Sequence, residues 1–178
     1  VGFSLYTELL ERAVRALREG RIPELDADAR RHTEVELHLP ALIPDDYLGD
    51  VHTRLMLYKR IASAPDDEVL DRLTEEMVDR FGVLPPQTAN LFQVARLRLR
   101  AAALGIRKLE LGTLGGRVLF FPNPPVDALV VIRMVQKLPK VYALDGPDKL
   151  KVRLELPGAA ERLRTAGDIL RVLGGTTS

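Results

Sequence analysis

The stretch Ile43–Pro86 reads IPDDYLGDVHTRLMLYKRIASAPDDEVLDRLTEEMVDRFGVLPP and carries most of the information about the fold. Its apolar residues recur at helical spacing, which predicts two successive amphipathic helices. We expect the first helix to begin near Asp45 and Asp46, because short acidic side chains after a proline accept hydrogen bonds from free amides at a helix start. The second helix is expected to end at Gly82, ahead of the two prolines that close the stretch.

The residues before this stretch show three different patterns. Apolar residues on one face of Phe3–Glu19 predict a connector helix. The segment Arg21–Thr33 is polar, contains a proline and has neither helical nor strand periodicity, so we predict a flexible linker. Residues 35–39 then alternate apolar and polar side chains, as in a half-buried strand. The chain is therefore predicted to consist of a connector at 1–33 and a domain at 34–178.

The residues after the stretch change from a helical to a mixed pattern. A third helix is predicted at Gln87–Leu104 and ends at a glycine. Two strands, 106–111 and 117–121, flank Gly115 and Gly116. Consecutive glycines accept the positive φ of tight turns, so this segment is predicted to form a β-hairpin.

The last part of the chain adds two helices and two strands. Helices are predicted at 126–138 and 159–173, and strands at 141–144 and 150–156. The predicted fold class is therefore α+β, with a helical first half and an antiparallel β-sheet with packed helices in the second half.

Composition excludes several classes of protein. The 178 residues are enough for one domain with a hydrophobic core. The chain has 26 basic and 25 acidic residues, so no overall electrostatic field attracts it to nucleic acid. The absence of cysteine excludes disulfides and thiolate metal sites, and we expect a cytoplasmic location. The longest apolar run, 128–132, is far short of the roughly 20 residues that span a bilayer, so no membrane partner is expected.

The first residue is Val1, and no signal-like segment follows it, so we interpret the chain as a piece of a longer protein. Motifs for catalysis are missing from it: there is no phosphate-binding loop, dinucleotide fingerprint or nucleophile elbow. The histidines lack metal-ligand spacing. They are His32, His38 and His52. We therefore predict no catalytic residue, no metal site and no cofactor.

A group of aspartates near the first predicted helix allows two interpretations. Asp45, Asp46 and Asp50 could bind a divalent metal ion, or they could accept hydrogen bonds from amides at a helix start. We favour the helix start, because it needs no further ligand.

A charged cluster near the end of the second predicted helix has an unusual position. Glu76, Asp79 and Arg80 follow one another at i, i+3 and i+4, so they border the same apolar stripe. Two carboxylates in the last turn are disfavoured by the helix dipole, by about 0.3 to 1 kcal/mol each. A rule broken without structural gain indicates function, although a solvated face with internal ion pairs remains an alternative.

A second charged set lies on the third predicted helix and just after it. Arg96 and Arg100 share a helix face, and Arg107 and Lys108 follow, so these residues could contact phosphates. However, Arg98 points away from the other two arginines of the helix. No aromatic residue lies among them to stack on bases. We keep a nucleic-acid-binding accessory domain as the alternative function.

One known family has the same ordered features. The series IPDDY, YKRIA, DRFG, LPP, ARLR and LGIRKLE resembles the C-terminal domain of transcription-repair coupling factors, the Mfd family. The resemblance extends over nearly the whole chain, from Val1 to the LDGP sequence at 144–147.

The resemblance implies a function in transcription-coupled nucleotide excision repair. In that family the C-terminal domain docks on an N-terminal UvrB-like module through charged residues of the helix that ends in DRFG. Glu76, Asp79 and Arg80 occupy those positions here, so we expect them to form an interdomain docking site. The resemblance implies that docking masks the surface by which the N-terminal module recruits UvrA, so that the protein is autoinhibited. The domain itself would then affect UvrA only indirectly. The parent family is an ATP-dependent DNA translocase that acts on RNA polymerase and DNA through other domains, and its motor residues are not in this chain.

Overall fold

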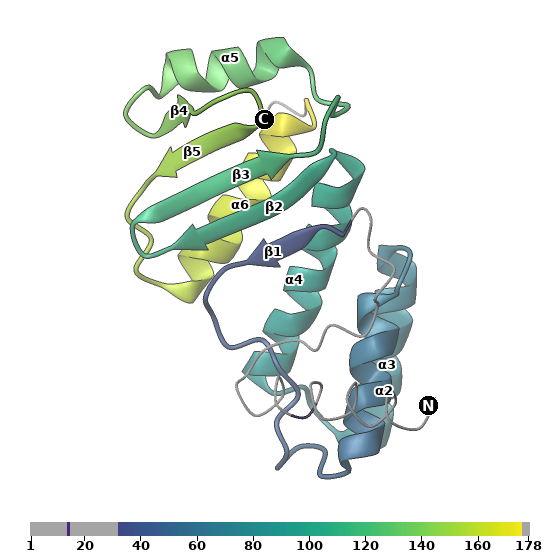
Figure 1. Ribbon diagram of the computed structural model, residues 1–178. Coiled ribbons are helices and arrows are strands. Elements are labelled where there is room, and N and C mark those ends of the chain that lie inside the picture. Colours follow the sequence, from purple (N-terminus) through teal and green to yellow (C-terminus); the bar gives the residue numbers. More distant parts are fainter. Residues whose placement is uncertain (1–13, 15–31, 176–178) are drawn as a thin grey trace, which may run out of the picture. The chain divides into compact units, whose positions relative to one another are not determined.

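The computed structural model describes Val14 and residues 32–175 (Figure 1). The connector helix predicted at Phe3–Glu19 and the linker predicted at Arg21–Thr33 lie almost entirely outside these residues. Their existence stays a prediction. Within the described part, no helix is long and apolar enough to cross a membrane.

The described residues divide into two compact units. One unit contains 40–96, and the other contains 32–39 and 97–175. The boundary falls within the helix α4 (Pro86–Ala103). Each unit is described by itself below.

The first unit is built from helices α2 (Val51–Ala62), α3 (Asp67–Phe81) and the first part of α4. The predicted start of α2 near Asp45 and Asp46 was wrong, because these two residues lie in a turn. The helix-start interpretation is confirmed for the third aspartate of the group, Asp50, which is the residue before the helix and caps it. Its Oδ2 accepts hydrogen bonds from the backbone and side chain of Thr53. The hydrogen bond from the Thr53 hydroxyl is the main cause of a lowered pKa for the Asp50 carboxyl. The chain first makes a turn after Pro44, in which the amides of Tyr47 and Leu48 donate to the Pro44 carbonyl oxygen. The free amides of the helix start therefore lie beyond this turn, after Asp50.

Helix α3 is defined by clear signals at both ends. At its start, the side chain of Asp66 accepts a hydrogen bond from the backbone of Val69 at 3.0 Å. At its end, Gly82 has a φ of 95°, a conformation that an L residue rarely adopts. The predicted stop at Gly82 is therefore confirmed. The apolar stripe of the helix is buried, with Leu70 and Met77 fully covered.

The second unit contains a five-stranded sheet with the order β1-β2-β3-β5-β4. Its strands are β1 (Glu34–Glu36), β2 (Ile106–Gly112), β3 (Gly115–Phe120), β4 (Tyr142–Leu144) and β5 (Lys149–Arg153). Strands β2 to β5 pair antiparallel, whereas β1 pairs parallel to β2. The predicted α+β class is confirmed, and the sheet is mixed because a strand from the first part of the chain joins its edge.

The hairpin between β2 and β3 forms, although its turn lies two positions earlier than the predicted Gly115–Gly116. Thr113 and Leu114 form the turn, and both glycines belong to β3. Gly115 alone of the pair has a positive φ, at 102°. Gly116 is required for a different reason: a Cβ atom there would lie 1.8 Å from the carbonyl oxygen of Glu110.

Two further helices complete this unit: α5 (Ala128–Lys137) and α6 (Ala159–Leu173). Figure 1 shows α6 behind the sheet and α5 beside β4. Side chains of β2, β3 and β5 that point toward α6 are fully buried, Leu109, Val118 and Leu150 among them. The other face of the sheet carries charged side chains that remain partly exposed.

Candidate protein-docking site

The end of α3 presents the charged cluster that the sequence predicts. Glu76 lies beside the buried Met77, and Asp79 and Arg80 follow in the last turn before Gly82. Glu76 is half-buried, whereas Asp79 and Arg80 are exposed. The helix holds the backbone of all three residues, so their side chains are presented from a rigid element.

Glu76 has a partner within its own unit. Its Oε2 lies 2.5 Å from Nη1 of Arg60 on α2, and both side chains are partly exposed. The internal ion pair that we kept as an alternative therefore exists for this carboxylate. A pair at such exposure contributes at most about 1 kcal/mol to stability, so it orients Glu76 more than it stabilises the fold.

Asp79 differs from Glu76, because it forms no ion pair with any other described residue. Two exposed apolar side chains lie on either side of it in sequence: Val78, which is 40% exposed, and Val83, which is 86% exposed. A charged group bordered by exposed apolar side chains is typical of a surface that a partner protein covers.

Arg80 is held by aromatic side chains. Its Cζ atom lies 4.8 Å from the centroid of the Phe81 ring, within the range of a cation–π interaction. The edge of that ring system meets Tyr47, with centroids 6.0 Å apart and an interplanar angle of 66°.

Tyr47 also closes the end of the helix. Its hydroxyl lies 2.9 Å from the Gly82 carbonyl oxygen and 3.3 Å from that of Met77, so it donates to carbonyl groups at the end of the helix. Burial raises the pKa of this hydroxyl above its ordinary value, because it disfavours the charged phenolate. The sequence offered no role for Tyr47 or Arg60. Both act across separations of 16 to 35 positions, which no local spacing rule reaches.

The histidines and aspartates that were considered as metal ligands do not form one cluster. All three histidines are exposed, and Nε2 of His38 lies 3.0 Å from Oε2 of Glu110. Among the described residues, no group of three or more His, Cys, Asp or Glu side chains could hold a metal ion. The earlier aspartates, Asp45 and Asp46, are exposed in the turn after Pro44.

The residues of the alternative basic surface have individual partners or positions. Arg96 forms ion pairs with Asp67 and Asp71, at 3.3 and 2.5 Å. Lys108 lies 3.8 Å from Glu34. Arg100 and Arg107 are exposed.

Comparison with known proteins identifies the family to which the chain belongs. The TRCF domain family matches residues 37–130, which include the whole of α2, α3 and α4 and the hairpin. The chain belongs to the TRCF domain family. Over 173 residues, this TRCF domain is 46% identical to the transcription-repair-coupling factors of Haemophilus influenzae and Escherichia coli, and the matches cover 97% of the chain. The chain spans 15% of the length of these two relatives.

A solved structure shares the fold of this TRCF domain. It is described as the crystal structure of the C-terminal domain of a transcription-repair coupling factor. The TM-score is 0.61 at 20% sequence identity, with 83% of this chain and 99% of that chain covered. The likeness supports the α+β fold described above.

Proposed function

We propose that this TRCF domain is a non-catalytic regulatory module that docks on the UvrB-like N-terminal module of the same protein. In the resting protein, docking masks the surface of that module that recruits UvrA. The parent protein then acts in transcription-coupled nucleotide excision repair, as an ATP-dependent DNA translocase whose motor lies outside this chain. Contacts with RNA polymerase and DNA belong to its other domains. The proposal requires no cofactor in the chain and a cytoplasmic location.

The observation that carries the proposal is the state of Asp79. This exposed carboxylate has no ion pair among the described residues, and it lies in a helix turn where the dipole disfavours negative charge. Such a group gains most from a partner that supplies a cation. Arginine side chains of the partner could bind it through charge-assisted, often bidentate hydrogen bonds, which also select one docking register.

The neighbouring residues support the same role in different ways. Glu76 is already oriented by Arg60, so a partner arginine would join an existing pair and form a network of alternating charge. Arg80, held over Phe81, offers a cation to a carboxylate of the partner. Val78 and Val83 supply exposed apolar area at the same helix end, and an interface core needs such area.

The strength of docking sets the degree of masking. The apparent affinity of a covered site is its intrinsic affinity multiplied by the fraction of time that the site is uncovered, so a contact of about 3 kcal/mol would weaken it roughly a hundredfold. Removal of 34–178 from the parent should therefore raise its affinity for UvrA. The isolated domain should not bind UvrA, because it adds no contact of its own.

Two measurements test the proposal. Calorimetry should detect binding between this chain and the separately expressed N-terminal module. Titration with UvrA should give a higher apparent affinity for the parent that lacks 34–178 than for the full-length parent. Equal affinity of the two parent forms for UvrA would show that the domain does not mask the site. Tight, direct binding of UvrA to the isolated domain would make it a receptor instead of a mask.

A further inference from the structure

The face of the sheet that points away from α6 has a charge pattern that the docking role does not explain. Strand β5 alternates buried and outward residues, and its three consecutive outward residues are all basic: Lys149, Lys151 and Arg153. In the register of the sheet, Lys151 lies directly opposite Arg117 of β3. Like charges directly opposite one another destabilise a sheet, so this arrangement has a cost in folding free energy.

Few carboxylates compensate for these cations. Lys149 and Lys151 share Asp145, at 3.2 and 3.6 Å. Arg117 shares Glu110 with His38, and its Nε is buried without a hydrogen-bond partner, 3.4 Å from Glu110 Oε1. The four outward cations of β3 and β5 therefore have only two carboxylate partners between them, Glu110 and Asp145, although the whole chain has a net charge of only +1. A local rule broken in this way points to a ligand.

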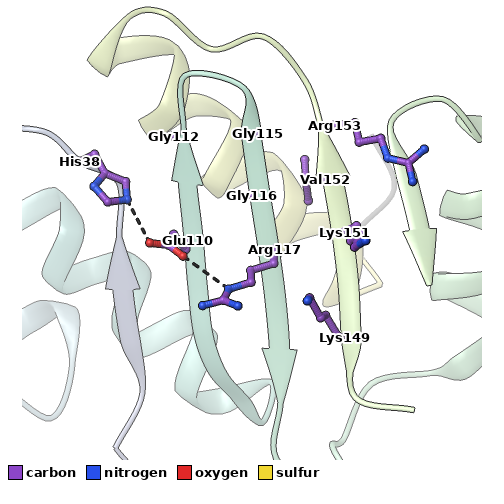
Figure 2. Close-up of a pocket in the computed structure, with 10 residues that line it drawn as sticks. All are labelled: His38, Glu110, Gly112, Gly115, Gly116, Arg117, Lys149, Lys151, Val152 and Arg153. Carbon is purple, nitrogen blue, oxygen red and sulfur yellow. Dashed lines mark hydrogen bonds and ion pairs between the residues drawn. The ribbon is translucent and has the colours of Figure 1, made fainter. Parts of the chain in front are cut away.

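The same residues surround a shallow cavity of about 300 Å³ (Figure 2). Glycines of the hairpin form part of its lining, so no side chain fills it there. Figure 2 shows Lys149 extending from β5 toward Arg117, while dashed lines connect Arg117 and His38 to Glu110. The cavity is thus open, polar and bordered by four permanent cations and a single carboxylate.

We infer that this face of the sheet binds the sugar–phosphate backbone of a nucleic acid without reading its bases. Outward residues two apart on a strand are spaced by about 7 Å, which is close to the separation of successive phosphates along a strand of nucleic acid. No Phe, Tyr or Trp lines the cavity, and the His38 ring is paired with Glu110, so the cavity has no row of aromatic rings on which successive bases could stack. Recognition would therefore depend on charge alone.

An acidic protein segment fits the face less well. Protein interfaces contain an apolar core, but the only branched apolar residue that lines this cavity, Val152, is buried. Strands β3 and β5 also have neighbours on both sides, so an incoming peptide could not add a strand to them. Interfaces with nucleic acid are more polar and more positively charged, as this face is.

The test is fluorescence anisotropy of a short labelled DNA duplex, and of a single strand, titrated with the full chain. If three or four phosphates are neutralised, affinity should fall about 40- to 150-fold between roughly 50 and 200 mM salt. Lys151→Glu should weaken binding at the lower salt concentration by about tenfold or more and reduce the salt slope by about 1. Arg117→Gln should weaken it as well. Thermal melts of both variants should stay close to that of the unchanged chain, since loss of the repulsion between positions 117 and 151 offsets loss of the exposed ion pairs to Asp145 and Glu110.

Arg133→Glu on α5 is the matched control, because it makes the same charge change at an exposed position outside the cavity. Its binding should stay within about twofold of the unchanged chain, given the short range of screened charges. Equal weakening by the control would show diffuse attraction without a site. Displacement of DNA by poly-glutamate more readily than by unlabelled duplex would assign the face to an acidic protein. Either result, or no binding at low salt, would overturn the inference. None of these residues belongs to the α3 cluster, so the docking proposal is tested separately.

Discussion

Nε of Arg162 donates a hydrogen bond to the carbonyl oxygen of Leu37 at 2.8 Å, across a separation of 125 positions. The same guanidinium donates to the carbonyl oxygens of Leu156 at 2.7 Å and of His38 and Pro157 at 3.3 Å. Arg162 is only 7% exposed. Its donors replace water for the backbone of two segments, so this cation ties the segment after β1 to the segment after β5.

Replacement of Arg162 by methionine should lower the free energy of unfolding by about 2 to 5 kcal/mol, because it leaves buried carbonyl groups without donors. The free energy of unfolding of Arg162→Lys should lie between those of the unchanged chain and of Arg162→Met, since the lysine ammonium cannot reproduce the planar fork of donors. Urea denaturation measures both. The exposed neighbour Arg164, changed to methionine, should shift stability by within about 0.5 kcal/mol. If the two methionine variants were equally stable, the hydrogen bonds from Arg162 to the carbonyl groups would make no net contribution to the free energy of unfolding.

Tyr58 gives a second stability prediction. Its buried hydroxyl accepts a hydrogen bond from the backbone amide of Ile43 at 2.6 Å. Tyr58→Phe leaves that amide without an acceptor, and we expect a loss of about 1 to 3 kcal/mol in denaturant titrations at pH 7. Tyr142→Phe is the comparison, because the half-buried Tyr142 hydroxyl has no hydrogen bond within the described residues. Similar losses for the two variants would contradict the prediction.

The same tyrosine predicts a dependence on alkaline pH. Burial raises the pKa of Tyr58, and the hydrogen bond from Ile43 and the charge of Arg54 only partly oppose this. A raised pKa means that the folded state holds the proton more tightly than the unfolded state. The resulting stability is therefore complete below the unfolded value of about 10 and is lost as pH rises through the folded value. Unfolding free energies measured between neutral and strongly alkaline pH should decline less steeply for Tyr58→Phe than for the unchanged chain, with lysine titration common to both.

For the docking site, Asp79→Arg is the sharpest variant. It should weaken docking to the N-terminal module by about 2 to 5 kcal/mol if the partner cation is desolvated, because that cation would then face another one. Folding should be retained, since Asp79 is exposed. Glu76→Arg should also weaken docking, but it places a second cation beside Arg60 and so affects the domain itself. Calorimetry with the N-terminal module measures both changes.

Glu68→Arg is the control for this pair, since Glu68 is an exposed carboxylate near the other end of the same helix, about 16 Å along its axis from Asp79. It should leave docking nearly unchanged. A loss equal to that of Asp79→Arg would mean that the helix acts only through its total charge. Unchanged docking of Asp79→Arg together with a collapsed melt would make Asp79 a structural residue.

The order of helices and strands could be predicted from the sequence because its signals are local. Asp66, Gly82 and Gly105 act on backbone groups within a few positions, so the end of α3 and the start of the β2–β3 hairpin follow from neighbouring residues. The errors are also local. Helix α2 begins at Val51, beyond the expected aspartate pair, because a turn intervenes after Pro44. The positive φ in the hairpin falls on Gly115 alone, since the turn precedes both glycines.

The sequence by itself determined the fold class, the family and the identity of the charged residues at the end of α3, because each depends on the order of residues along the chain. Only the tertiary structure decided what surrounds them. It paired Glu76 with Arg60, placed Tyr47 under the helix end, and set Lys151 opposite Arg117. These relationships depend on strand register and helix packing, which bring together residues far apart in sequence. Hydrophobic burial drives that packing without regard to charge, so no spacing rule could have specified which charged side chains would meet.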